Sequence, residues 1–289
     1  MARPLRCFEE GRCYEVSDRT LGEAYHLLPS TVVNAIIVGA MALACAAVPE
    51  VRPLGFTVLS DHWHLMLRAG HDPAAVSKFM QILKSTVARA MNAHLGRRGI
   101  FWARRFSSIV VLDDRAVLRR LVYFVMNAVN AGLCARFEEW PGVSTTAHLV
   151  GVRSACGDVE LPLALPPGWE GLDGAQLAEQ RGHLLAEVRA AEAEVAAERM
   201  RLGLRRPRVE QILGRTHHSD RPANPKRTRK PLCFSSSAPL AEAFRKTWRA
   251  WVAAYRAASD AFRAGVLDVM FPAQALPPRL TRPPIEAAA

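Results

Sequence analysis

The sequence lacks the features that would place this protein outside the cell or in a membrane. Its six cysteines form no CxxC pair and no secretory signal precedes them, so we expect reduced thiols in a cytoplasm. One uncharged run, Val32–Val48, falls short of the roughly 20 apolar residues that a membrane span requires. Ser30 before this run is a typical helix N-cap, which favours a buried helix of a globular protein. There is no internal repeat, and hence no sign of a solenoid.

Acidic residues are few compared with basic ones. The 289 residues include 38 Lys and Arg against 27 Asp and Glu, which gives a net charge of +11. Such a balance favours a polyanionic partner, of which nucleic acid is the commonest. The alternative is a solubilising charge spread evenly over the surface. Basic residues that cluster would favour a polyanionic partner, and an even spread would favour a solubilising role.

Residues 11–150 are predicted to form an α+β domain. Hydrophobic periodicity and helix-end signals predict alternating strands and helices. The expected elements are a strand at Cys13–Val16, a helix at Ser30–Val48, a hairpin at Pro53–Leu67, a helix at Asp72–Leu95, a strand within Ile100–Leu112 and a helix from Asp113 to Gly132.

The hairpin is expected to have one apolar side on each strand. Residues two apart on a strand point to the same face, which would group Leu54, Phe56 and Val58 on the first strand. Ser60-Asp61 would form the turn, and Trp63, Leu65 and Leu67 would share a face of the second strand.

Residues 151–289 differ in character and are predicted to form a mainly helical and basic extension. A Pro-rich connector leads to a helical run at Ala175–Leu202, and another helix is expected at Leu240–Leu267. Between them, Arg201–Lys230 is the most basic stretch and has no apolar periodicity, so we predict that it lacks regular structure and contacts DNA or serves as a solubilising linker. The Pro-rich end of the chain is predicted to be disordered.

The first chemical signal is His62-Trp63-His64 on a predicted strand. The two imidazoles then project from one face and can share a metal ion, while Trp63 points into the core. A His-x-His motif alone is more often coincidental, so a third partner is needed.

The second signal is Tyr123 with Asn127 on the helix that begins near Asp113. Counting about 100° per residue places them on the side opposite the apolar stripe, away from the core. Their i,i+4 spacing stacks the phenol above the amide, with Arg119 and Arg120 one turn earlier. The plain alternative is an exposed tyrosine on a solvated face.

Five segments in this order and spacing resemble the REP-associated tyrosine transposases of the HUH single-tyrosine transposase superfamily. They are LGFTVLSDHWHLML, FMQILKSTVARAMNAHLG, GIFWARRFSS, LVYFVMNAVNAGL and WPGVST, within residues 14–146. The stretches KRTRKPLC and AFRAGVLDVMFPAQALPP are similar to the tail of a longer subgroup of that family.

The resemblance implies a ferredoxin-like α+β fold and a single-stranded DNA endonuclease and strand transferase. His62, His64 and Asn127 would bind Mg²⁺ or Mn²⁺, and Tyr123 would be the nucleophile that forms a 5′-phosphotyrosine. A tyrosine hydroxyl is a poor nucleophile at neutral pH, and a divalent metal on the phosphate oxygens would supply part of the activation that it needs. The sequence departs from the family pattern at Asp61, Ala128 and Asn130, where Asn, Pro and Arg are usual.

A DNA-holding surface is expected near these residues. Trp102, Arg104 and Arg105 combine an aromatic ring with two guanidinium groups, which suits base stacking and phosphate contacts. Ordinary solvated side chains are the alternative. Further basic candidates are Lys78, Lys84, Arg89, Arg119 and Arg120.

Single-stranded or hairpin DNA is therefore the expected partner. The resemblance leaves a monomer and a homodimer both open. A domesticated DNA-binding protein that no longer cleaves is the alternative function, and Ala128 and Asn130 keep it open. A metal hydrolase of small substrates is a third hypothesis, but only Asp61 offers a general base near the metal.

Overall fold

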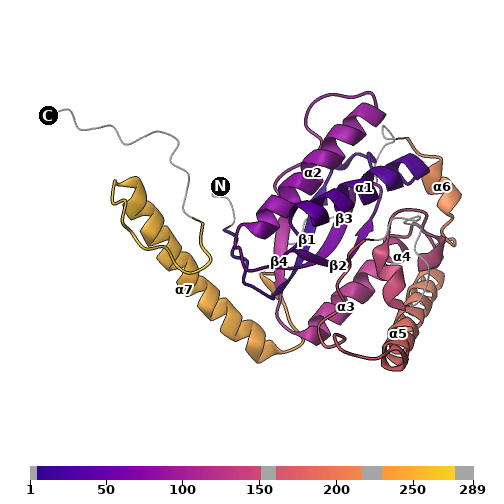
Figure 1. Cartoon of the computed structure of the whole chain (residues 1–289). Coiled ribbons are helices and arrows are strands. Elements are labelled where there is room, and N and C mark those ends of the chain that lie inside the picture. The colour runs from indigo at the N-terminus through magenta and orange to yellow at the C-terminus, as the bar shows by residue number, and fades with distance from the viewer. Residues whose placement is uncertain (1–4, 151–160, 217–229, 277–289) are drawn as a thin grey trace.

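A computed structural model describes residues 5–150, 161–216 and 230–276 of the chain (Figure 1). Its five strands form one sheet in the order β2-β3-β1-β4-β5, in which β5 pairs with β4 in parallel and the other pairs are antiparallel. With helices after β1 and after β3, this is the βαββαβ arrangement of a ferredoxin-like fold, as expected. The strands are β1 (Cys13–Arg19), β2 (Arg52–Val58), β3 (His62–Arg68), β4 (Ser107–Val111) and β5 (Cys233–Phe234).

Helices cover both faces of the sheet. The helices α1 and α2 pack against each other on one face, and α3, α4 and α5 lie on the other (Figure 1). Short 3₁₀ turns lie at Leu21–Glu23, Phe137–Glu139 and Thr145–Val150. The helices are α1 (Thr31–Ala47), α2 (Ala75–His94), α3 (Asp114–Val125), α4 (Asn127–Asn130), α5 (Gly174–Arg201), α6 (Val209–Leu213) and α7 (Ala238–Arg263).

The apolar stripe predicted for α2 faces the sheet. Its five members are fully buried with the strand residues Trp63, Leu65 and Leu67, which share one face as expected. They are Val76, Phe79, Met80, Leu83 and Val87. This layer forms one hydrophobic core, and a second core lies between the opposite face of the sheet and α3 to α5.

The expected position of Leu54 beside Phe56 and Val58 is wrong. A β-bulge between Pro53 and Gly55 shifts the register of β2, so Leu54 packs in the core on the α3 side while Phe56 packs against α1 and α2. Alternation along a strand predicts which face of the sheet a side chain occupies only where the strand pairing is regular.

The first strand is longer than the predicted Cys13–Val16, because β1 continues to Arg19. Ser17 and Asp18 pair with His64 and Trp63 of β3 even though their side chains are polar. The buried Asp18 carboxylate forms an ion pair with Lys84 of α2, which offsets the cost of burying it.

The predicted helices of the extension are confirmed at α5 and α7. The basic stretch does contain regular structure, because α6 lies within it at Val209–Leu213; residues 217–229 of that stretch lie outside the described residues. The end predicted to be disordered lies outside them from residue 277.

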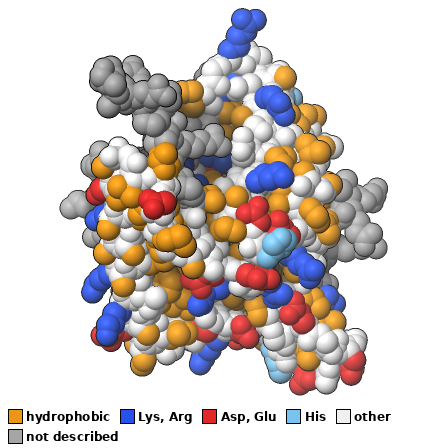
Figure 2. All heavy atoms as spheres, turned by 60° about the vertical axis from the view of Figure 1, so that its left-hand side comes forward, with side chains coloured by type: hydrophobic (Ala, Val, Ile, Leu, Met, Phe, Trp, Pro, Cys, Tyr) orange, Lys and Arg blue, Asp and Glu red, His pale blue; other side chains and the backbone are white. Residues whose placement is uncertain are grey.

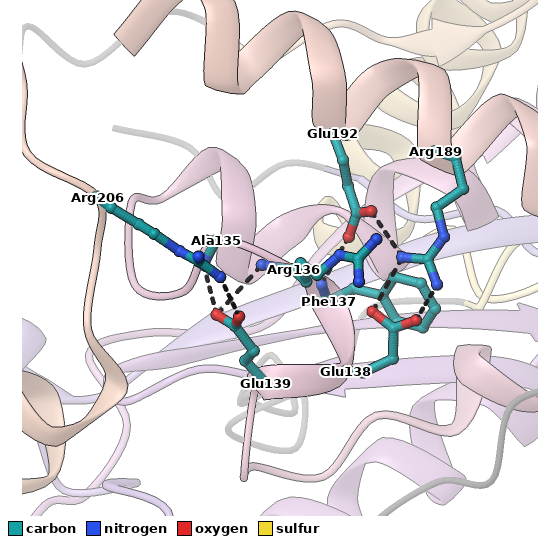
Figure 3. Close-up of polar contacts among 8 residues, drawn as sticks. All are labelled: Ala135, Arg136, Phe137, Glu138, Glu139, Arg189, Glu192 and Arg206. Atoms are coloured by element: carbon teal, nitrogen blue, oxygen red, sulfur yellow. Dashed lines mark hydrogen bonds and ion pairs between the residues drawn. The ribbon is translucent and has the colours of Figure 1, made fainter. Parts of the chain in front are cut away.

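Charged pairs attach α5 to the turn after α4, together with the buried Leu184 and Val188. Figure 3 shows Arg189 between Glu138 and Glu192, and Glu139 facing Arg206. Glu192 is 7% exposed and also accepts a hydrogen bond of 2.8 Å from the Phe137 amide. The extension thus contributes to the second core.

None of the helices in the described ranges is both long and apolar enough to cross a membrane. The cysteines at positions 7, 13, 45, 134 and 233 are free thiols, and Cys156 lies outside the described residues.

Asp113 joins the two parts of the chain. Its Oδ1 caps α3 by accepting the Ala116 amide at 2.9 Å, and its Oδ2 accepts Ser235 Oγ at 2.7 Å and the Ser236 amide at 2.8 Å. We predict that Asp113→Ala lowers the free energy of unfolding by about 1 to 2 kcal/mol, the scale of a lost N-cap. Urea denaturation measures this, with Asp114→Ala, an exposed neighbour in the first turn, as the control.

The contribution of Asp113 to stability depends on pH. Burial alone would raise the pKa of Asp113, but hydrogen bonds from Ser236, Ser235 and Ala116 lower it to about 2. The stabilisation is therefore complete above the unfolded-state value of about 3.9 and is lost as the pH falls through about 2. A stability difference between the wild type and Asp113→Ala that stays constant from pH 5 to pH 2 would contradict this role.

Candidate active site

The two histidines of β3 lie on the sheet face that α3 covers. Strand alternation sends Trp63 into the core with α1 and α2, where it is 3% exposed, and leaves His62 and His64 on the opposite face. Their ring centroids are 5.3 Å apart. As expected, the two imidazoles share one face of the strand while Trp63 points into the core.

Each imidazole has a carboxylate at Nδ1. His62 Nδ1 is 2.6 Å from Asp61 Oδ1, and His64 Nδ1 is 3.0 Å from Glu15 Oε1. A neutral imidazole that donates its Nδ1 proton to a carboxylate keeps the lone pair of Nε2 for a ligand. In such a tautomer, each ring would leave Nε2 without a proton.

Burial keeps His64 neutral. Desolvation lowers the pKa of His64 to about 4, although the hydrogen bond to Glu15 works in the opposite direction. For Glu15, burial alone would raise the pKa, but hydrogen bonds from His64 and Arg120 outweigh it and lower the pKa below its ordinary value. At neutral pH the pair is therefore a neutral imidazole beside a carboxylate.

Tyr123 lies next to this pair. Its ring centroid is 5.6 Å from that of His64, with the rings at 84° to each other. The preceding turn of α3 places the Arg120 guanidinium 4.0 Å from the centre of the Tyr123 ring. Residues far apart in sequence, on β1, β3 and α3, therefore converge at one place.

The predicted position away from the core is wrong for Asn127, which is 4% exposed, while Tyr123 is half-buried against the second core. The expected helix to Gly132 is interrupted at Met126: α3 ends at Val125 and the short helix α4 begins at Asn127. The second core then encloses α4, since α5 packs over it. Helical periodicity along residues 113–132 could not predict this burial, because it contains no information on the α5 helix that packs over α4.

Several expected DNA-binding residues have internal partners. Trp102 is 9% exposed, packs against Trp63 at 4.4 Å between ring centroids, and donates its Nε1 proton to the Lys84 carbonyl at 2.9 Å. Lys84 forms the ion pair with Asp18, and Arg120 bonds Glu15. All three side chains thus have partners within the protein.

The other basic candidates are exposed, namely Lys78, Arg89, Arg104, Arg105 and Arg119. On the face drawn in Figure 2, Lys and Arg side chains lie among acidic and hydrophobic ones rather than in one continuous patch. At the end of the basic stretch, Lys230 donates its Nζ proton to Ser17 Oγ at 2.6 Å, which brings a cation of the extension to β1.

Two residues of the site were missed by the sequence analysis, Glu15 and Phe234. Glu15 is a buried carboxylate on the central strand, and its place between apolar neighbours in Tyr14-Glu15-Val16 was a usable signal. Phe234 lies on β5 with its ring centre 4.2 Å from the Arg120 guanidinium, and no local pattern indicates this contact.

Within the described ranges, no group of three or more His, Cys, Asp or Glu side chains is arranged to hold a metal ion.

A ferredoxin-like sheet with a His-x-His strand beside a helical tyrosine is the arrangement that the resemblance to the HUH single-tyrosine class implies. Residues 44–121 match the family model described as "Transposase IS200 like", which confirms that resemblance. The matched range contains both histidines and ends just before Tyr123. The match supports a transposase-type function on DNA.

Among solved structures, the chain is similar to one described as "Structure of the REP associates tyrosine transposase bound to a REP hairpin". The identity is 17%, the similarity covers 55% of this chain and 93% of that chain, and the TM-score is 0.45. No curated protein matched the chain.

We predict that His64 remains neutral well below the usual histidine range. In the metal-free protein, the imidazole NMR signal that disappears in His64→Gln is expected to titrate with a pKa of about 4. Because the unfolded-state pKa is about 6.5, protonation of His64 should destabilise the fold as the pH falls from 6.5 towards 4. A titration midpoint near 6.5 in the folded protein would show that the ring is not desolvated.

Proposed function

We propose that this protein is a transposase-type endonuclease and strand transferase for single-stranded or hairpin DNA, in which Tyr123 is the nucleophile. The observation that carries the proposal is the convergence of His62, His64 and Tyr123, with 5.6 Å between the ring centroids of His64 and Tyr123. Sequence-distant groups of these types at one place suit metal-assisted attack on a phosphodiester.

In the proposed reaction the Tyr123 hydroxyl loses its proton, and its oxygen forms a bond to the phosphorus of the scissile phosphodiester. The bond to the 3′ oxygen breaks, and that oxygen takes up a proton to become a free 3′-hydroxyl. The protein keeps a 5′-phosphotyrosine. Because the ester energy is conserved, attack by a 3′-hydroxyl on this linkage would rejoin strands without ATP.

The proposed donors are of the types that bind a divalent metal ion. His62 and His64 would offer Nε2 atoms because their Nδ1 atoms face carboxylates, and the buried Asn127 would offer an amide oxygen. Mg²⁺ or Mn²⁺, when bound there, would polarise the phosphate and offset developing negative charge. Arg120 orients the Tyr123 ring through its planar guanidinium face.

The proposed DNA surface uses the exposed cations Lys78, Arg89, Arg104, Arg105 and Arg119. Phosphate contacts from such residues would position the strand without selecting its sequence. We further propose that residues 11–150 are the catalytic domain and 151–289 an extension. The bond from Lys230 to Ser17 supports a role of the extension near the site.

We predict that Tyr123→Phe abolishes the covalent protein–DNA adduct and leaves the fold and DNA affinity close to those of the wild type. Only the nucleophilic hydroxyl is lost, and the contacts of Tyr123 with His64 and Arg120 are made by its ring, which phenylalanine keeps. A labelled single-stranded oligonucleotide with an internal hairpin, analysed on a denaturing gel, measures the adduct.

The matched control is Tyr255→Phe on α7, which also removes one phenolic hydroxyl and should retain normal adduct formation. An adduct of normal yield with Tyr123→Phe would refute the nucleophile assignment. Tight DNA binding with no adduct from the wild type would favour the non-cleaving alternative.

We also predict that EDTA abolishes adduct formation and that Mn²⁺ or Mg²⁺ restores it. His62→Ala should slow the reaction by roughly 10²- to 10³-fold, the scale for losing one group that stabilises developing charge. The control is His71→Ala, whose exposed side chain is not part of the site. Wild-type activity that persists in EDTA would exclude the metal role.

A further inference from the structure

The Glu15 carboxylate is buried and hydrogen-bonded to both His64 and Arg120. It is 4% exposed, its Oε1 accepts from His64 Nδ1 at 3.0 Å and from Arg120 Nη2 at 3.1 Å, and its Oε2 accepts from Arg120 Nε at 2.6 Å. A buried carboxylate is stable only when such charge-assisted bonds replace its hydration. Its position, and with it the position of both donors, is therefore narrowly defined.

Arg120 contacts two aromatic rings. Its guanidinium carbon is 4.0 Å from the centre of the Tyr123 ring and 4.2 Å from the centre of the Phe234 ring, and 19% of its side chain is exposed. The planar group can satisfy the carboxylate edge-on and both rings face-on, which the compact ammonium of a lysine could not do. One side chain thus connects β1, α3 and β5.

We propose that Glu15 and Arg120 are positioning residues that set the histidine and the tyrosine relative to each other. Glu15 holds His64 in the tautomer that has its proton on Nδ1 and its lone pair on Nε2. Arg120, bound to the same carboxylate, holds the Tyr123 ring, and Phe234 of the extension also packs against the Arg120 guanidinium. The inference rests on the proposed function, since it assigns these residues a part in that reaction.

The alternative is a buried ion pair that only stabilises the fold. The contacts argue against it, because the side chains in contact with the pair include both the candidate ligand His64 and the candidate nucleophile Tyr123. The extension offers a comparison, since the buried Glu192 pairs with Arg189 and bonds the Phe137 amide without touching the site. The same chemistry at the two places can therefore be compared directly.

The experiment uses the full-length chain and measures affinity for Mn²⁺ by electron paramagnetic resonance of the free ion, together with adduct formation and thermal unfolding. Glu15→Gln keeps the shape of the side chain but removes its charge. We expect roughly 10- to 100-fold weaker Mn²⁺ binding, the scale for loss of a carboxylate behind a ligating histidine. Saturating Mn²⁺ should restore part of the adduct rate.

Arg120→Lys separates the positioning of His64 from the positioning of Tyr123. It keeps a cation for Glu15 but loses the planar stack, so Mn²⁺ affinity should change less than in Glu15→Gln, and the adduct rate at saturating Mn²⁺ should stay roughly 10-fold or more below that of the wild type. Glu192→Gln and Arg115→Gln, which remove a buried carboxylate and an exposed α3 cation outside the site, should leave both measurements unchanged.

Three results would overturn the proposal. One is a folded Glu15→Gln protein with wild-type Mn²⁺ affinity and adduct rate. If a single variant unfolds, Glu15→Gln combined with Arg120→Met removes both charges and leaves neither unpaired, and wild-type Mn²⁺ affinity in that folded protein would be the second. The third is a ¹⁵N NMR spectrum of the metal-free wild type that shows the His64 proton on Nε2. A wild type that neither binds Mn²⁺ nor forms an adduct, with the proton on Nδ1, would refute the proposed function and leave the positioning of His64 intact.

Discussion

The Glu15 carboxylate lies on the central strand, and its burial constrains everything on that face of the sheet. Removing a carboxylate from water is expensive unless donors from the protein replace the lost hydration. Here the donors come from β3 and α3, through His64 and Arg120. Any shift of α3 along the sheet would break two charge-assisted bonds, so the helix that carries Tyr123 is held in register with the strand that carries the histidines.

One face of the sheet carries the core with α1 and α2, and the other carries the candidate site. Residues of β3 alternate between the two faces, so Trp63, Leu65 and Leu67 stabilise the core with α1 and α2 while His62 and His64 face α3. The side with α1 and α2 is mostly apolar, and its buried Asp18 carboxylate is paired with Lys84 of α2. The α3 side also contains apolar residues such as Met66 and Phe124, but its polar groups are satisfied by specific ion pairs at one end. Rigid packing on the first face supports an ordered site on the second.

The extension is structurally continuous with the rest of the molecule. The strand β5 pairs with β4 in parallel, Phe234 stacks on Arg120, and Ser235 and Ser236 bond the residue that caps α3. On the same face, α5 covers α4 through apolar contacts and through the ion pairs of Arg189. A catalytic segment bounded at residue 150 would therefore keep its sheet order but lose the outer support of Arg120 and α4.

The sequence alone determined what local patterns can encode. Hydrophobic periodicity and N-cap residues predicted the order and the approximate bounds of α1, α2, α5 and α7. Period-two alternation predicted that His62 and His64 share a face, since that depends only on strand geometry. The motif order predicted the transposase-like family, which the match over residues 44–121 confirms.

Only the tertiary structure decided which polar groups meet. The bond from Glu15 to Arg120 joins residues from two elements, and Phe234 arrives from beyond a long connection, so no local period could reveal either contact. The burial of Trp102 and Asn127 likewise depends on which elements cover them, as does the pairing of Lys84 with Asp18. The physical reason is that side-chain exposure and charge partners are properties of packed layers, whereas the signals in a sequence report single elements.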